Sequence, residues 1–259
     1  MESLKSHGKW YAAVPVRGAM TARTGDFSLW AEPGAAARSG DYAGKMTLVE
    51  CECKAEDLVS VPTEGMARVR RLAPVRRLDA REAADAIERE YASGLLQALF
   101  LHDEVERIIK AYSLKNAPSN VRKRVSGYKA LPHDLVSQWG HMRYKVGKEY
   151  DMGGIVAPCN RGYHFCRRLM DVFDYIVADA GTRLFVVEAW GRVQDDPCAG
   201  NKTAATGIKL VRELDFSEAY DIVRDAPAGR GHANKLQKSR ALDSLGELMK
   251  LKGQAGKGK

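Results

Sequence analysis

The sequence predicts an α+β protein in which two related mixed units are joined by a helical hairpin and followed by a flexible basic C-terminal tail. Two stretches carry the same order of features at an offset of 136 to 138 residues, which is typical of an internal duplication. A stretch with helical periodicity separates them. The matching positions are Gly25 with Gly162, Val49-Glu50 with Val187-Glu188, and Val75-Arg76 with Val211-Arg212.

The first unit spans residues 1–78. It begins with the short aromatic strand "DFSLW" and continues into a helix-compatible stretch at 32–40. A strand rich in β-branched residues, "MTLVECEC", follows it, and then a loop containing "VPTEG" and a strand-like run at 69–78. This order of strand, helix, strand, loop and strand is the pattern that the second unit repeats.

The predicted connector spans residues 79–118 and is helical. Asp79 and Glu82 match the Asp-x-x-Glu capping box that begins a helix. Ser93-Gly94 divides the stretch into two helices, and Pro118 disfavours helix continuation near its end. One apolar face results from the three- and four-residue spacing of Leu95, Leu96, Leu99, Val105, Ile108, Ile109 and Tyr112.

The second unit spans residues 119–225 and repeats the first. The strand "YHFC", a helix-compatible stretch at 169–177 and the strand "RLFVVEAWGRV" come first. A loop containing "DDPCAGN" and a strand at 207–214 follow, and Asp215 with Glu218 forms a second capping box. Residues 226–259 are then expected to form a mobile basic tail with one optional helix.

The composition predicts a soluble protein of the cytoplasm. The N-terminus lacks the apolar core of a signal peptide, and no run approaches the ~20 apolar residues of a membrane span. Five cysteines without a secretory context indicate reduced thiols. Lys and Arg number 41 against 33 Asp and Glu, which is compatible with an anionic partner and equally with ordinary solvated surface.

The second half contains, in order, "GYKAL", "YKVGKEYDMGGIVAPC", "RGYHFCRRLMDVFDYI", "RLFVVEAWGRV" and "KTAATGIKLVREL". This set, over about residues 121–225, resembles an uncharacterised domain of phage and prophage genomes whose signature includes Cys-x-x-Gly-Phe-His-x-Cys. The resemblance implies a phage or prophage origin and no established activity. One departure is Ser137, which stands where the family pattern has an upstream cysteine.

The stretch "CNRGYHFCRR" offers three metal ligands, Cys159, His164 and Cys166. A structural zinc site normally has four ligands, and Ser137 stands where the family pattern offers another cysteine. The remaining cysteines could complete the set only by folding in from a distance. We therefore expect His164 and Cys166, which share one face of a strand, to pack into a core in preference to binding zinc. The distant cysteines are Cys51, Cys53 and Cys198.

Two kinds of catalysis are considered for the same stretch. A Cys–His nucleophilic pair needs a group that orients the imidazole, and none is evident here. The pattern of a Gly-aromatic strand followed by a helix is also similar to ADP-ribosyltransferase folds, which use NAD. That similarity implies a pocket beside Tyr163 and His164, with Glu188 or Glu213 as the carboxylate. Lys129 stands where such an enzyme would need an arginine.

Basic residues offer a nucleic-acid interface in two places and in the tail. On an extended strand the arginines of "RVRRLAPVRR" are divided between both faces, so that no single stripe is expected. Contacts to phosphates would then lack sequence readout. The candidates for nucleic-acid or partner binding are Arg68, Arg70, Arg71, Arg76, Arg77, Arg122, Lys123 and Arg124.

The leading functional hypothesis is a non-catalytic binding module encoded by a phage or prophage. It is expected to engage a host or phage macromolecule in the bacterial cytoplasm, for example as an inhibitor of a host defence system. An NAD-using ADP-ribosyltransferase-like enzyme and a non-specific nucleic-acid-binding protein are the alternatives. No membrane partner, resident cofactor or metal is expected.

Overall fold

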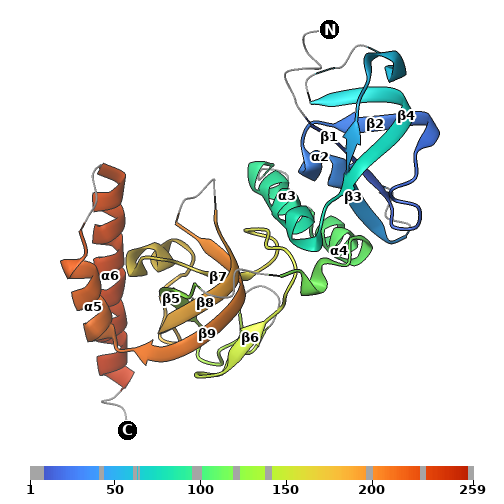
Figure 1. Cartoon of the computed structure of the whole chain (residues 1–259). Helices are drawn as coiled ribbons and strands as arrows, with labels where there is room; N and C mark the ends of the chain where they lie inside the picture. The colour runs from blue at the N-terminus through green and yellow to red at the C-terminus, as the bar shows by residue number, and fades with distance from the viewer. Residues whose placement is uncertain are drawn as a thin grey trace. The chain divides into compact units, whose positions relative to one another are not determined.

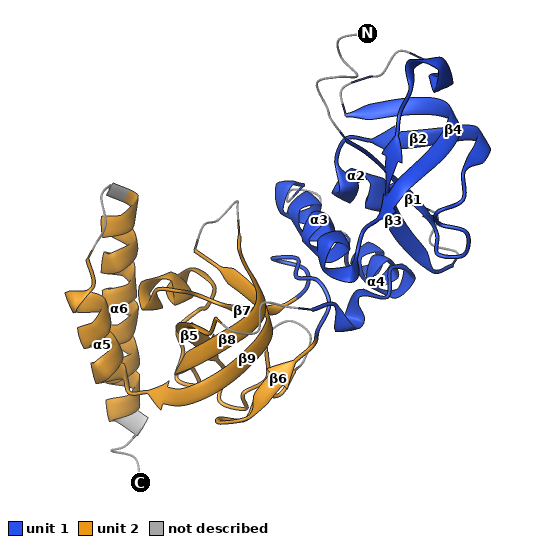
Figure 2. Ribbon diagram, viewed as in Figure 1, with its two compact units in different colours: residues 1–119, 153–161 blue, residues 120–152, 162–259 orange. Residues whose placement is uncertain are grey.

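The computed structural model describes residues 9–40, 44–60, 63, 65–94, 101–118, 123–137, 142–196, 201–227 and 232–255. The chain forms two compact units (Figures 1 and 2). Unit 1 comprises residues 1–119 and 153–161, and unit 2 comprises residues 120–152 and 162–259. The chain is 34% helix and 36% strand, which confirms the predicted mixture of both.

Unit 1 is built on a closed barrel of four antiparallel strands in the order β1-β2-β4-β3. The strands are β1 (Trp10–Pro15), β2 (Arg23–Trp30), β3 (Met46–Glu52) and β4 (Met66–Arg77). In β1 every second residue is buried, because successive side chains of a strand point to opposite faces. The buried side chains of β1 fill the barrel together with those of the other three strands, and include Trp10, Ala12, Val14, Leu29, Val49, Val69 and Leu72.

Short helices cover one side of this barrel. They are α2 (Pro33–Arg38), α3 (Ala80–Ser93), α4 (His102–Ala111) and the 3₁₀ turn η3 (Leu114–Asn116), whose buried residues share one cluster, while the 3₁₀ turn η1 (Ala55–Asp57) lies beside β4. The predicted capping box at Asp79 and Glu82 is present, and α3 ends at Gly94, where the sequence divides the connector. Residues 95–100 lie outside the described residues, so that the helical hairpin stays a prediction. The buried residues of α3 and α4 belong to one core cluster, which also contains strand residues of unit 1.

Unit 2 contains a five-stranded antiparallel sheet with the order β5-β8-β9-β6, in which β7 also pairs with β9. Its strands are β5 (Val125–Leu131), β6 (Glu149–Asp151), β7 (Tyr163–Phe165), β8 (Arg183–Asp195) and β9 (Thr203–Leu214). The 3₁₀ helix η4 (Leu169–Asp174) follows β7, and α5 (Phe216–Asp225) follows β9. A bridge from Tyr128 to Cys166 connects β5 with the end of β7.

The predicted flexible tail is instead an ordered helix over most of its length. Residues His232–Ala255 form α6, which lies beside α5 (Figure 1). Ala241, Leu245 and Leu248 of α6 are buried, because the apolar residues at three- and four-residue spacing face α5 and η4. None of the helices in the described ranges is both long and apolar enough to cross a membrane.

The two units share their strand pairings. Adding 136 to the residue numbers of the β3–β4 pairs, and of the β2–β4 pairs from Phe27 to Leu29, gives the paired residues of unit 2, so that Glu50–Arg76 becomes Val186–Arg212. A β-bulge follows this pair in both units. The sequence alignment of Val49-Glu50 with Val187-Glu188 is therefore two residues out of register. The same offset relates Phe27–Val69 to Tyr163–Ala205 and the N-cap Asp79 to Asp215.

For β1 and β5 the offset is 117. The pair Tyr11–Trp30 in unit 1 then corresponds to Tyr128–Cys166 in unit 2. The change from 117 to 136 places 19 additional residues between β5 and β7, where the chain contains β6 and residues 153–161. The first strand of each unit, Trp10–Pro15 and Val125–Leu131, has no counterpart in the predicted elements.

We call residues 153–161 the strap. It follows β6 in the chain and belongs to unit 1. Ile155 and Ala157 of the strap are buried in the core cluster that α3 and α4 share. The amide of Val156 donates to Oε1 of Glu88 on α3 at 3.0 Å. At Gly153 a side chain cannot fit, since its φ is +59° and a Cβ would lie 2.1 Å from the carbonyl oxygen of Lys115.

Candidate functional site

The stretch that offers chemistry, "CNRGYHFCRR", includes the end of the strap and strand β7. Tyr163 and Phe165 belong to the core cluster inside unit 2, and Cys166 belongs to a different cluster that packs against η4, α5 and α6. Because strand residues alternate, His164 points to the same side as Cys166. Tyr163 is 8% exposed, so that its side chain is a core residue.

Burial keeps both His164 and Cys166 neutral. Burial, together with the nearby ammonium groups of Lys129 and Lys202, lowers the pKa of His164 to about 3. Burial, together with the carboxylate of Asp171, raises the pKa of the Cys166 thiol to about 12. A thiol reacts as a nucleophile only when it is deprotonated, and Cys166 is therefore inert near pH 7.

The predicted metal ligands are not brought together. Cys159 belongs to unit 1, whereas His164 and Cys166 belong to unit 2. Across the described residues, no three His, Cys, Asp or Glu side chains are close enough to hold a metal ion. Cys51 is buried in the barrel of unit 1, and Cys198 lies outside the described residues.

A lysine inside unit 2 is the unusual group that sequence reasoning missed. Nζ of Lys129 donates to the carbonyl oxygen of His164 at 2.7 Å and lies 5.4 Å from the centre of the Tyr144 ring. Burial lowers the pKa of Lys129 to about 8. Tyr144 makes edge contacts with Tyr150 and Tyr163, at 5.4 and 6.4 Å between ring centres. The burial of Lys129 could not be predicted from the sequence, because β5 was not among the predicted strands.

The two candidate carboxylates are engaged in ion pairs on the sheet surface. Glu188 accepts from Arg124 at 2.9 Å, and Arg124 also lies over the Trp190 ring at 4.7 Å. Glu213 accepts two hydrogen bonds from Arg183, at 2.9 and 2.5 Å, and these lower the pKa of Glu213.

Most of the candidate arginines on β4 already have partners. Arg68 pairs with Asp26, Arg76 makes a two-bond contact to Glu82 at 2.8 Å, and Arg77 donates to Thr47. Arg70 and Arg71 are exposed and have no ion-pair partner among the described residues. Of the remaining candidates, Arg122 lies outside those residues, Lys123 is exposed, and Arg124 pairs with Glu149 and Glu188.

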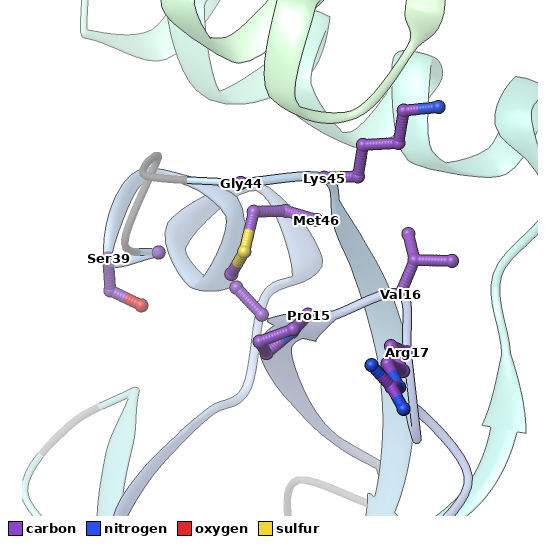
Figure 3. Close-up of a pocket in the computed structure, with 9 residues that line it drawn as sticks. Pro15, Val16, Arg17, Ser39, Gly44, Lys45 and Met46 are labelled. Atoms are coloured by element: carbon purple, nitrogen blue, oxygen red, sulfur yellow. The ribbon is translucent and has the colours of Figure 1, made fainter.

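Unit 1 contains a pocket of about 610 Å³ that no sequence motif indicated. It lies between the end of β1 and the segment that leads from α2 into β3 (Figure 3). Its volume is in the range of ~300–1,000 Å³ that small ligands and side chains occupy. A second pocket of about 500 Å³ lies between η4 and α6 in unit 2 and is lined mainly by polar and charged side chains, including Asp174, Gln237 and Arg240.

Residues 125–222 match a family model described as "Domain of unknown function (DUF7666)". The match extends from β5 to α5 and includes the strap, the lysine at 129 and the segment around His164. No curated protein matches the chain. No solved structure matches it either.

Proposed function

We propose that this chain is a non-catalytic binding module of phage or prophage origin. It acts in the bacterial cytoplasm by engaging a host or phage macromolecule, for example a component of a host defence system. The observation that carries the proposal is the state of the Cys–His segment, because that segment holds the residues that a catalytic function would use. The thiol of Cys166 is buried and the imidazole of His164 is half-buried, and desolvation favours the neutral form of each.

The enzymatic alternative requires Tyr163 and a carboxylate to be available to a substrate. An NAD pocket beside Tyr163 would need that ring to line a cavity, but the ring packs into the core of unit 2. It would also need a free carboxylate, and both candidates neutralise neighbouring arginines. A binding function requires neither a cavity beside Tyr163 nor a free carboxylate.

We further propose that the two units descend from one duplicated scaffold. What supports this is the common register. Equivalent pairings in the two units are separated by a constant offset of 136 residues, and the same β-bulge recurs in both units. In unit 1, Ser28 and Trp30 take the places of His164 and Cys166. The Cys–His segment is therefore an addition to a scaffold that folds without it.

Nucleic-acid binding is a second candidate, favoured by the distribution of charge. Unit 1 has 18 Lys and Arg against 17 Asp and Glu, a net charge of +1, while unit 2 has 23 against 16, a net charge of +7. A phosphate-binding function would then belong to unit 2 and would weaken steeply as salt rises. If the affinity for nucleic acid does not change between about 50 and 300 mM salt, the result argues against a phosphate-binding function.

The proposal is tested by asking for catalysis and for a partner in parallel. Labelled NAD and a bacterial lysate are incubated with the wild-type protein and with His164→Ala. No transfer of label is expected in either case, whereas transfer that His164→Ala abolishes would make the protein an enzyme. Affinity capture with the full chain, followed by titration of the purified candidate, is expected to give saturable one-to-one binding.

A further inference from the structure

The pocket of unit 1 lies where the two units differ in side-chain size. Ser39 and Gly40 line the pocket, and the offset of 136 places Tyr175 and Ile176 at the equivalent positions of unit 2. Ile176 packs against the core cluster of unit 2 together with Ala130, the equivalent of the pocket residue Ala13. Ser39 is smaller than Tyr175, whereas a Cβ at Gly40 would lie 3.0 Å from the hydroxyl oxygen of Tyr112, so that the place of Ile176 is already occupied in unit 1.

In unit 2, side-chain hydrogen bonds close the turn that precedes β8. Asp179 accepts hydrogen bonds there from the amide of Gly181 at 2.9 Å and from the hydroxyl of Thr182 at 3.1 Å. Lys45 and Met46 occupy the positions of Gly181 and Thr182 in unit 1. The turn that ties up this corner of unit 2 is therefore replaced in unit 1 by an exposed lysine and a buried methionine.

The pocket combines an apolar interior with cations at one edge. Ala13, Pro15, Val16 and Met46 supply its apolar lining, and Met46 is 5% exposed. In the view of Figure 3, Val16 and Arg17 lie on one side of the pocket, with Pro15 and Met46 between them and Ser39, and the side chain of Lys45 extends upward, away from Arg17. Arg17 and Lys45 are exposed, and neither has an ion-pair partner among the described residues.

The edge that carries these cations is held in place before any ligand binds. The amide of Val16 donates to the carbonyl oxygen of Lys45 at 2.9 Å, which joins the two cationic positions through the backbone. Arg23 donates to the carbonyl oxygen of Gly18 at 2.9 Å and so fastens the loop that bears Arg17. A site ordered in advance loses less conformational entropy when it binds.

We propose that this pocket receives an apolar side chain from an acidic segment of a partner protein. The apolar side chain enters between Pro15 and Met46, and carboxylates beside it in the partner segment neutralise Arg17 and Lys45. Charge complementarity selects the occupant, because two unpaired cations flank an otherwise apolar space. This inference rests on the proposed binding function and names the surface and the chemistry that the function uses.

The probe is a fluorescent peptide of aspartate and glutamate residues around one phenylalanine, titrated against the full chain. Binding is expected to weaken about tenfold or more when the phenylalanine is replaced by alanine, or when the protein carries Arg17→Glu with Lys45→Glu. Ser39→Tyr, which introduces the residue of unit 2 at an exposed position, is expected to weaken it by a similar factor. The matched control, Arg70→Glu with Arg71→Glu, makes the same charge change on exposed residues of β4 and is expected to leave binding unchanged.

Site-specific signals identify the pocket independently of affinity. The methyl resonances of Met46 and Ala13 are expected to shift when the peptide is added, while that of Met152 in unit 2 stays in place. No binding of the peptide, equal binding without the phenylalanine, or loss of binding only in the β4 control would each overturn the inference. If a captured partner still binds the Arg17→Glu, Lys45→Glu variant at full affinity, the pocket is wrong and the binding function stands.

Discussion

At the scale of single residues, the polar groups inside unit 2 distinguish it from unit 1. Lys129 stands where unit 1 has the core residue Ala12, and His164 stands where unit 1 has Ser28. Their residue types suggested metal binding or catalysis, whereas their surroundings make them neutral or weakly basic. The identity of these residues could be seen in the sequence, but their pKa values follow from burial, which depends on strands distant in the chain.

His164 should make the protein sensitive to acid. Its folded pKa of about 3 lies below the ordinary 6.5 of an unfolded chain, so that the unfolded state binds more protons between these values. The stability that His164 supports is therefore complete above pH 6.5 and is lost as pH falls toward 3, by at most about 1.4 kcal/mol per pH unit. Urea unfolding at pH 7 and pH 5 should show a smaller loss for His164→Gln than for the wild type.

The control for that experiment is His133→Gln, since His133 is an exposed histidine of the same unit. The carboxylates of the protein are the same in the wild type and in both variants, so that they contribute equally to the loss of stability in acid. An equal loss of stability in His164→Gln and the wild type would mean that the imidazole is already solvated in the folded protein.

Lys129→Met should stabilise the protein. The lysine has no carboxylate partner among the described residues, and burial penalises its charge, whereas methionine fills the same space without that penalty. Losing the hydrogen bond to the His164 carbonyl costs about 1 kcal/mol, and the relief of burying the charge exceeds it, so that the free energy of unfolding at pH 7 should rise by about 1 kcal/mol. The gain should shrink between pH 8 and 10.5, where the folded wild type loses the proton before the unfolded chain does.

Thermal or urea unfolding at pH 7 and pH 10 measures this gain, with the exposed Lys145 changed to Met as the control. A Lys129→Met variant that is less stable than the wild type at pH 7 would show that the ammonium group is held by interactions stronger than its burial cost.

At the scale of elements, local signals predicted the helix starts and the order of strands, and they failed where pairing is non-local. The N-caps Asp79 and Asp215 were identified from the sequence because the signal lies within four residues, but only Asp79 forms the predicted capping box. Asp215 accepts from the amide of Ser217, and Glu218 pairs with Arg212 in place of closing a box. Strands β1 and β5 were not identified, since their partners in β3 and β8 lie more than thirty residues away. α6 was read as tail because its buried stripe has meaning only once α5 and η4 are present.

The strap provides the clearest test at this scale. Ile155 lies in the half of the sequence that matches the domain family, yet its side chain is buried in the core of unit 1. Ile155→Ala should therefore destabilise unit 1, by about 2–5 kcal/mol, because it leaves a cavity in a fully buried site. Hydrogen exchange should increase for amides of α3 and α4 and stay unchanged in β8 and β9.

The matched variant is Ile208→Ala, which removes an equally buried side chain from β9 in unit 2. It should produce the reverse pattern, with faster exchange in β8 and β9. Faster exchange in unit 2 alone after Ile155→Ala would contradict the assignment of the strap to unit 1.

At the scale of the whole molecule, the chain passes between the units three times, after residues 119, 152 and 161. A division of the sequence into consecutive domains could therefore not describe it, although the predicted boundary at residues 118–119 lies next to the first of these crossings. Each unit has its own hydrophobic clusters, and the strap is the one segment that interrupts the sequence of unit 2 to complete a cluster of unit 1.

This arrangement predicts how the protein behaves when it is divided. A fragment of residues 1–119 lacks the strap and leaves the site of Ile155 and Ala157 open, so that it should be less stable than unit 1 in the full chain. A fragment of residues 120–259 still carries the strap and exposes its apolar residues. Coexpressed, the two fragments should therefore copurify, because each supplies the surface that the other lacks.

Ile155→Asp in the longer fragment should abolish that association, since it places a carboxylate in a site formed by α3 and α4 side chains. Val177→Asp in the same fragment makes the same chemical change at a position that is 91% exposed, and should leave the association intact. Copurification measured by size-exclusion chromatography distinguishes the two. Association that survives Ile155→Asp would mean that other surfaces join the fragments, and the strap would then be a covering loop without which unit 1 folds.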